Sequence, residues 1–208
     1  MDISKLHYLS PQEANNLLSS VRNPKHRLIV LLMVDCGLRV SECISLRYSN
    51  FDFKSKTLNV NSLKKRNKNV VRQIPLSNRL YVELAKYLNN KKGIQATDYL
   101  LPNPAKPAYH ICRSAVNKML TRLQYREPVT SVNLHPHTLR HTFATQHLIA
   151  GTPLHNIKEM LGHSSLDSTL IYTHIPTEQL RKNVENVTSP KSKLHKFFIT
   201  LFSPLHFW

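Results

Sequence analysis

Apolar positions recur at helical spacing along the first part of the chain. The segment "LSPQEANNLLSSV" opens with Ser10 as a helix N-cap, a proline at the first helical position, and Glu13 three residues after the cap. The apolar run "LIVLLMV" belongs to a second expected helix at about 24–36, which ends near Gly37. A third helix is expected to start around Ser41 and to cover "SECISLR".

The pattern then changes from helical spacing to alternation. The segments "FDF", "TLNV" and "VVRQIPL" are short, alternate between apolar and polar positions, and are rich in residues that favour strands. They predict a small antiparallel sheet of three strands. The loop between the last two strands contains the basic run "LKKRNKN".

Helical spacing returns after the sheet and continues towards the C-terminus. The segment "SNRLYVELAKYLNNKK" predicts a helix with Ser77 as its cap, and "TDYLLPNPAKP" predicts an extended piece followed by a proline-rich loop. No internal repeat is visible, and the pattern as a whole predicts an α+β fold that is mainly helical. Further helices are expected at about 108–124, 138–150, 153–161, 165–174 and 177–187.

Composition narrows the class of protein. The chain has 208 residues, of which 41% are hydrophobic, enough for one well-packed domain with at most a small appendage. Its three cysteines, Cys36, Cys43 and Cys112, form no CxxC pair, which is typical of a reduced intracellular protein. The N-terminal segment lacks a secretory signal pattern, and the longest apolar run is too short to span a bilayer. We therefore expect a cytoplasmic protein without membrane contact.

The charge of the chain points to a polyanionic partner. Lys and Arg number 29 against 12 Asp and Glu, which gives a formal net charge of +17. Such an excess favours nucleic acid as the partner, and we expect a location close to the nucleoid. A solvated basic surface and a ribosome-associated protein are the alternatives that charge alone leaves open.

The segment "HPHTLRHTFATQHL" holds the densest group of chemically active side chains. Pro136 and Thr138 suit a helix start, so that His137, Arg140 and His141 fall on one face near an N-terminus. The spacing of the two histidines would suit two zinc ligands, but the HExxH glutamate is missing and the arginine between them would repel a dication. We therefore expect no metal here.

Two other interpretations of these side chains stay open together. His147 and His141 suit partly buried histidines of a packed core. His137 and Arg140 suit an anion site, because a planar guanidinium matches phosphate oxygens and a helix N-terminus adds backbone N–H groups.

Other segments add to the same chemistry. "EMLGHSSLDSTLIYTHI" places His163 directly after a glycine and Tyr172 nine residues later, while "DCGLRVSE" places Arg39 just past a helix-ending glycine. Two arginines, two histidines, a lysine and a tyrosine are what metal-free phosphoryl transfer would need. The hairpin loop supplies the cations Lys64, Lys65, Arg66 and Lys68.

At this point the sequence resembles the tyrosine recombinases, which include phage integrases, transposon integrases and the enzymes that resolve bacterial chromosome dimers. The matching stretches are "CGLRVSECISLR", "SLKKRNKNVVRQIPLS" and "HPHTLRHTFATQHLIAGTPLHNIKEMLGHSSLDSTLIYTHI", in family order, between about Leu9 and Val187. The resemblance implies the tyrosine-recombinase catalytic fold, with the small three-stranded antiparallel sheet on one edge.

The resemblance also implies a role for individual residues. Two arginines would hold the scissile phosphate, Tyr172 would attack it to form a 3′-phosphotyrosyl link, and Lys64 would protonate the leaving 5′-hydroxyl. Lys65 is adjacent and remains an alternative to Lys64. Glu42 would steady the site and His141 would be structural. The implied catalytic set is Arg39, Lys64, His137, Arg140, His163 and Tyr172. The expected DNA contacts are Lys65, Arg66, Lys68 and Arg72.

The partners implied are double-stranded DNA, three further copies of the chain in a tetramer, and accessory DNA-bending proteins. No cofactor, metal or ATP is implied, since the phosphotyrosyl ester conserves the bond energy. The resemblance points to DNA recombination or integration within a mobile element. We expect a catalytic domain over 1–188 and a basic, aromatic tail over 189–208, without the family's N-terminal clamp domain. The tail either packs on its own domain or docks on a neighbouring protomer.

Three functions follow from this reasoning. The first is a site-specific recombinase or integrase that exchanges DNA strands through phosphotyrosine. The second is a DNA-binding remnant or regulator that lacks full recombination because the clamp domain is absent. The third is a topoisomerase-like enzyme that nicks and closes DNA with the same chemistry but without strand exchange.

Overall fold

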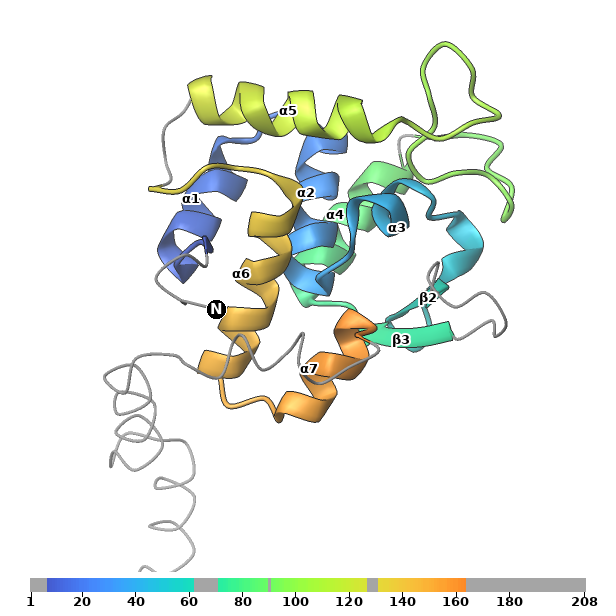
Figure 1. Cartoon of the computed structure of the whole chain (residues 1–208). Helices are drawn as coiled ribbons and strands as arrows, with labels where there is room; N and C mark the ends of the chain where they lie inside the picture. The colour runs from blue at the N-terminus through green and yellow to red at the C-terminus, as the bar shows by residue number, and fades with distance from the viewer. Residues whose placement is uncertain (1–6, 62–70, 90, 127–130, 164–208) are drawn as a thin grey trace, which may run out of the picture.

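The computed structural model describes residues 7–61, 71–89, 91–126 and 131–163. Within these residues the chain forms a mainly helical fold with a small antiparallel sheet at one edge, as expected (Figure 1). The helices are α1 Pro11–Ser20, α2 Pro24–Cys36, α3 Val40–Ile44, α4 Asn78–Asn89, α5 Arg113–Arg126, α6 Pro136–Ile149 and α7 Leu154–Leu161. The strands are β1 Phe51–Asp52, β2 Thr57–Asn61 and β3 Val71–Pro75, preceded by a short 3-10 helix at Tyr48–Asn50.

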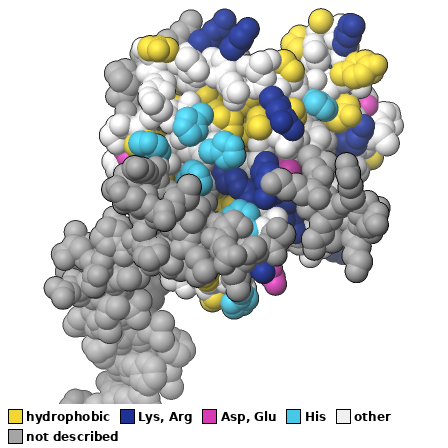
Figure 2. Space-filling model, in the orientation of Figure 1, with side chains coloured by type: hydrophobic (Ala, Val, Ile, Leu, Met, Phe, Trp, Pro, Cys, Tyr) yellow, Lys and Arg dark blue, Asp and Glu magenta, His cyan; other side chains and the backbone are white. Residues whose placement is uncertain are grey.

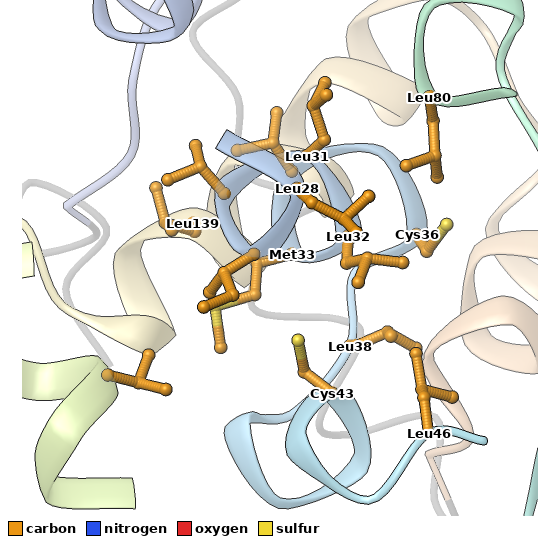
Figure 3. Packing of buried hydrophobic residues seen from close by; sticks show 14 of the residues in the cluster. Leu28, Leu31, Leu32, Met33, Cys36, Leu38, Cys43, Leu46, Leu80 and Leu139 are labelled. Carbon is orange, nitrogen blue, oxygen red and sulfur yellow. The ribbon is translucent and has the colours of Figure 1, made fainter. Parts of the chain in front are cut away.

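Helix α2 is the centre of the hydrophobic core. Its side chains from Leu28 to Val34 are all buried, and it packs against α1, α3, α4 and α6. Figure 3 shows Leu80, Cys43 and Leu139 reaching the core around it from other helices. A helix that is apolar on every side needs neighbours all around, so the remaining helices are arranged about α2.

Local signals define the helix ends that the sequence predicted. Ser10 caps α1, accepting a hydrogen bond from the backbone N–H of Glu13 while the Glu13 carboxylate accepts one from the backbone N–H of Ser10. Gly37 ends α2 in the left-handed conformation, with φ of 60°. A Cβ atom at Gly37 would lie 2.5 Å from the Phe143 ring, so the turn into α3 needs a glycine there.

The sheet has the order β1-β2-β3 with antiparallel pairs, which confirms the expected strands. Burial alternates along β3, where Arg72 and Ile74 face inward, and Val60 of β2 lies opposite Arg72. The segment 62–70 between β2 and β3 lies outside the described residues, and with it the expected proton donor Lys64 and the expected DNA contacts Lys65, Arg66 and Lys68.

Three helix predictions differ from the structure, and the first is α4, which ends at Asn89 although its predicted segment runs to Lys92. Helix α3 ends at Ile44 because Arg47 pairs with Tyr99 in an isolated antiparallel bridge. The helix expected at 108–124 starts only at Arg113, since a second bridge joins Pro102 to His110. The helices expected at 165–174 and 177–187, and the tail over 189–208, lie outside the described residues.

A second, smaller hydrophobic cluster holds α7 against α6. It consists of Phe143 and Ala144 from α6 with Ile157 and Leu161 from α7. Helix α7 also contacts β3, so its C-terminal end lies between the sheet and the start of α3. None of the described helices is long and apolar enough to cross a membrane.

Candidate active site

A buried carboxylate, Glu42, lies at the centre of the candidate site. It sits in the first turn of α3 and is only 2% exposed. Its Oε2 accepts a hydrogen bond of 2.8 Å from the backbone N–H of Arg39, and its Oε1 accepts one of 2.9 Å from Arg39 Nη1. The start of α3 therefore fixes both the backbone and the side chain of Arg39 to the same carboxylate.

Arg72 forms the most complete ion pair of the site. Its Nη1 and Nη2 donate to Glu42 Oε1 and Oε2 at 3.1 and 2.7 Å, and its Nε donates to the Met160 carbonyl at 2.8 Å. We expected Arg72 to contact DNA from the hairpin, but its side chain is 8% exposed and faces inward. The alternation of β3 explains this burial, because Arg72 shares the inward face of the strand with Ile74.

Arg140 reaches the same place from α6. Its Nη1 donates to the Gly37 carbonyl at 2.6 Å and its Nη2 to the Leu161 carbonyl at 2.7 Å. Its Nη1 also lies 3.9 Å from Glu42 Oε2, and the residue is 5% exposed. Helix α6, anchored by its buried side against α2, thus brings a second expected phosphate-binding arginine to Glu42.

The C-terminal end of α7 supplies acceptors to all three arginines. The carbonyls of Met160 and Leu161 accept the bonds above, and the Leu161 and Gly162 carbonyls lie 3.5 Å from Arg39 nitrogens. The last carbonyls of a helix lack partners within the helix and carry the negative end of its dipole, so they suit guanidinium groups. This arrangement also fixes the position of His163, which follows directly.

Gly162 makes this close approach possible. It adopts the left-handed conformation, with φ of 65°, and a Cβ atom there would lie 2.9 Å from Arg72 Nη1. Another residue at this position would therefore meet both backbone strain and the guanidinium.

Electrostatics keep Glu42 ionised despite its burial. Burial by itself raises the pKa of Glu42, but hydrogen bonds from Arg72, the charge of Arg72, and the bond and charge of Arg39 lower it more. The net result is a pKa below the ordinary value of 4.5. The carboxylate therefore holds one negative charge among the three guanidinium groups at neutral pH.

Two histidines near the arginines, His141 and His163, are neutral, because burial and the neighbouring positive charges both lower the pKa of an imidazole. Burial, followed by the charges of Arg140, Arg39 and Arg72, lowers the pKa of His163 to about 4. Burial and the neighbouring His137 and Arg140 lower the pKa of His141 to about 4 as well. Both imidazoles therefore act at neutral pH as hydrogen-bonding groups without adding charge.

The other three histidines of the segment 135–147 lie in different surroundings. His137 is exposed in the first turn of α6, with its ring centroid 6.3 Å from that of His141. His135 caps α6 through its ring nitrogen, which accepts from the Thr138 backbone N–H. His147 is partly buried, with its ring 4.4 Å from that of Phe143, as the core interpretation expected.

The structure thus brings together four of the expected residues, Arg39, Glu42, Arg140 and His163, with His141 and His137 beside them. Lys64 and Tyr172 lie outside the described residues. Sequence reasoning missed the pairing of Arg72 with Glu42, although a charged side chain at an inward position of a strand was the available signal.

The arrangement suits an oxyanion with several oxygens. Lys, Arg and His side chains gather in the middle of the face seen in Figure 2. Three guanidinium groups against one carboxylate leave a net positive charge, and planar guanidiniums match phosphate oxygens. Across the described ranges, no group of three or more His, Cys, Asp or Glu side chains is placed to hold a metal ion.

Comparison with known proteins agrees with this chemistry. A family model described as the phage integrase family matches residues 7–179. The chain is 32% identical over 176 residues to the tyrosine recombinase XerC of Oceanobacillus iheyensis, which covers 82% of this chain and 55% of that protein. It is 33% identical over 177 residues to the tyrosine recombinase XerA of Pyrococcus horikoshii, covering 85% of this chain and 60% of that one. The chain therefore matches little more than half the length of these curated relatives.

Solved structures share the fold. A crystal structure of XerA recombinase superposes with a TM-score of 0.74 at 28% identity, covering 88% of this chain and 65% of that chain. The Tn1549 transposon integrase in complex with a circular intermediate DNA has the same fold, with a TM-score of 0.69 at 22% identity, over 86% of this chain and 65% of that one. The chain belongs to the phage integrase family, the tyrosine recombinases, and carries a catalytic domain of that family.

Proposed function

We propose that this chain carries the catalytic centre of a site-specific recombinase that cuts and rejoins DNA through a 3′-phosphotyrosyl bond at Tyr172. The observation that carries the proposal is the convergence of Arg39 and Arg140 on one buried carboxylate, that of Glu42. Two guanidinium groups held side by side match the non-bridging oxygens of one phosphodiester. The DNA complexes known for the Tn1549 integrase and for XerH bound to difH support DNA as the substrate.

In the proposed reaction the phenol oxygen of Tyr172 attacks the phosphorus and the bond to the 5′-oxygen breaks. The phenol proton passes to water, and the leaving 5′-oxygen takes a proton from Lys64, or from the adjacent Lys65. Arg39 and Arg140 neutralise the charge that builds up on the non-bridging oxygens. Because two backbone carbonyls already fix Arg140, this guanidinium needs little rearrangement during the reaction.

The reverse reaction rejoins the DNA. A 5′-hydroxyl from another strand attacks the phosphotyrosyl ester, which returns the phenol and restores a phosphodiester, so the number of ester bonds is conserved. In this proposal neutral His163 and exposed His137 hydrogen-bond the phosphate. Strand exchange would need four copies of the chain on two duplexes, with Lys65, Arg66 and Lys68 gripping the backbone through salt-sensitive contacts.

The test uses a duplex with a nick next to a candidate cleavage position, so that a short product diffuses away and the covalent complex is trapped. We expect an adduct that survives denaturation and EDTA in the wild-type protein and is lost in Tyr172→Phe. Tyr109→Phe is the matched control, because Tyr109 is 66% exposed and lies in the loop before α5. An adduct that persists in Tyr172→Phe would show that another residue is the nucleophile.

The same assay separates the alternatives. An added strand with a free 5′-hydroxyl should be joined to the trapped DNA if the chain is a recombinase. Relaxation of a supercoiled plasmid without such joining would favour the topoisomerase-like activity. Salt-sensitive binding of duplex DNA with no adduct on any nicked substrate would favour the DNA-binding remnant.

A further inference from the structure

Arg72 connects three segments that lie far apart in the sequence. It belongs to β3, it pairs with Glu42 of α3 across 30 residues, and it donates to Met160 of α7 across 88 residues. Its Nε, Nη1 and Nη2 are all engaged in these bonds. The side chain therefore points into the protein, towards α3 and the end of α7.

Burying a charged side chain at this position costs desolvation free energy. An arginine here therefore indicates a role that an apolar residue could not fill. The inward face of the sheet is otherwise apolar, with Leu58, Val60 and Ile74 buried beside it. Burying an ion pair recovers its desolvation cost only when the geometry is very good, and an apolar pair of similar volume often gives equal stability. What the guanidinium adds is a fixed direction for the carboxylate it holds.

The first consequence concerns Arg39. Its guanidinium is 2.9 Å from Glu42 Oε1 but 3.5 Å from the nearest α7 carbonyls, and its side chain is 23% exposed. Arg39 is therefore held chiefly by Glu42. Because Arg72 engages both oxygens of Glu42, the direction in which Arg39 points depends on Arg72.

The second consequence concerns Arg140. One of its two carbonyl partners is Leu161, the residue after Met160, whose carbonyl Arg72 holds. The close fit of Arg72 against Gly162 leaves little freedom at this end of α7. Arg72 thus bears on the position of Arg140 through the backbone and on Arg39 through Glu42, by two separate routes.

We propose that Arg72 is a positioning residue of the catalytic centre: through Glu42 and the Met160 carbonyl it sets Arg39 and Arg140 at the spacing that one phosphodiester requires. This proposal rests on the proposed function. Because Glu42 and the Met160 carbonyl engage all three nitrogens of the Arg72 guanidinium, its replacement should slow the chemical step while DNA binding is largely kept.

The test compares Arg72→Lys and Arg72→Met with the matched control Arg79→Lys. Arg79 also forms a two-pronged pair with a carboxylate, that of Asp35. Its side chain is 42% exposed, however, and it lies outside the Glu42 cluster, which consists of Glu42 and its three arginines Arg39, Arg72 and Arg140. Three quantities are measured for each protein: the melting temperature, the Kd for duplex DNA, and the single-turnover rate of adduct formation on the nicked duplex at saturating protein.

Arg72→Lys keeps the charge but cannot hold both carboxylate oxygens and a carbonyl with one planar group. We expect it to fold and to bind DNA like the wild type, and to form the adduct roughly 100-fold more slowly, a loss of the size seen when one charge-stabilising donor is misplaced. Arg72→Met should be slower still, and Arg79→Lys should match the wild type. Histidine NMR gives a second readout, since the His163 signal should shift in the Arg72 variants and stay unchanged in Arg79→Lys.

An Arg72→Lys protein that is folded and forms the adduct at the wild-type rate would overturn the positioning role. A loss of DNA affinity that accounts for the whole loss of rate would also overturn it, and would return Arg72 to the class of DNA contacts. A wild-type protein that forms no adduct on any nicked duplex would overturn the proposed function instead, and the two failures are thereby distinguished.

Discussion

Two arginine–carboxylate pairs of this protein have nearly the same chemistry but different surroundings. Arg72 holds both oxygens of Glu42, and Arg79 holds both oxygens of Asp35. Both carboxylates are almost completely buried, with side chains 1% and 3% exposed, whereas the arginines are 8% and 42% exposed. The difference therefore lies in the cation and in what else surrounds the carboxylate.

The Asp35 pair joins two helices. Asp35 lies near the end of α2, and both Arg79 and the Ser77 hydroxyl donate to it, which fastens the start of α4. The Glu42 pair has further cations around it, Arg39 and Arg140, and the carbonyls at the end of α7. A single two-pronged pair thus stabilises the packing of two helices, whereas a carboxylate shared by three arginines holds several cations close together.

The largest difference should appear when each carboxylate loses its charge. Glu42→Gln leaves Arg72 buried without its counter-charge and should lower the free energy of unfolding by about 3 to 5 kcal/mol. Asp35→Asn should cost about 1 kcal/mol, because Arg79 can turn to water and the Ser77 hydroxyl keeps an acceptor. Urea denaturation measures both. Equal losses in the two variants would contradict the difference between the pairs.

The next effect separates catalysis from stability. Arg140→Ala should reduce the single-turnover rate of adduct formation by about 10²- to 10³-fold, because one fixed donor to the phosphate oxygens is lost. Asp35→Asn should keep the wild-type rate, which makes it the matched control. If both variants slow adduct formation equally, the arginine cluster has no special part in the chemistry.

Acid should act on the Glu42 pair in a defined direction. The pKa of Glu42 in the folded protein is below its ordinary value of 4.5, so the unfolded state takes up the proton first as the pH falls. The stability from this pair is therefore complete above about pH 4.5 and is lost as the pH falls through the lower folded-state pKa. Unfolding should be measured over the range from about pH 2 to about pH 7. It should show this loss of stability in Arg79→Lys and a smaller loss in Glu42→Gln.

The pKa of His163 reflects first its burial and then the positive charges of Arg140, Arg39 and Arg72. Its pKa of about 4 in the folded protein lies below the ordinary 6.5, so the unfolded state binds more protons between these values. Its contribution to stability is therefore complete above pH 6.5 and decreases as the pH falls towards 4. Histidine NMR of the protein without DNA should show a neutral His163 at about pH 6, below the ordinary pKa of a histidine. A charged imidazole at that pH would contradict the account of the cluster.

The smallest effect is expected at the exposed arginine. Arg79→Lys should change the free energy of unfolding by about 0.5 kcal/mol, and the change should shrink at high salt because solvent screens this pair. Denaturation at low and high ionic strength checks this. A loss as large as that of Glu42→Gln would mean that exposure does not distinguish the two pairs.

The parts of the fold that could be predicted depend on local signals. The capping box at Ser10 and the left-handed Gly37 determine helix ends with residues only a few positions away, and both were predicted. The start of α5 could not be predicted in the same way, because a bridge between Pro102 and His110 keeps the preceding segment extended.

The same distinction between local signals and contacts across the fold applies to the candidate site. Motif spacing and family resemblance identified Arg39, Glu42, Arg140 and His163, which the fold brings together. The pairing of Arg72 with Glu42 was missed because it depends on the strand register and on a contact 30 residues away. Burial, which sets the lowered pKa of His163, is likewise a property of the packed structure.

We have proposed that Glu42 and Arg72 act as one unit that positions Arg39 and Arg140. A double-mutant cycle on adduct formation by Glu42→Gln and Arg72→Met tests it most directly. We predict that Arg72→Met slows the reaction strongly in the wild-type background but little in Glu42→Gln, with a coupling of about 1 to 3 kcal/mol. Rate losses that simply multiply in the double variant would show two independent residues and would contradict the claim.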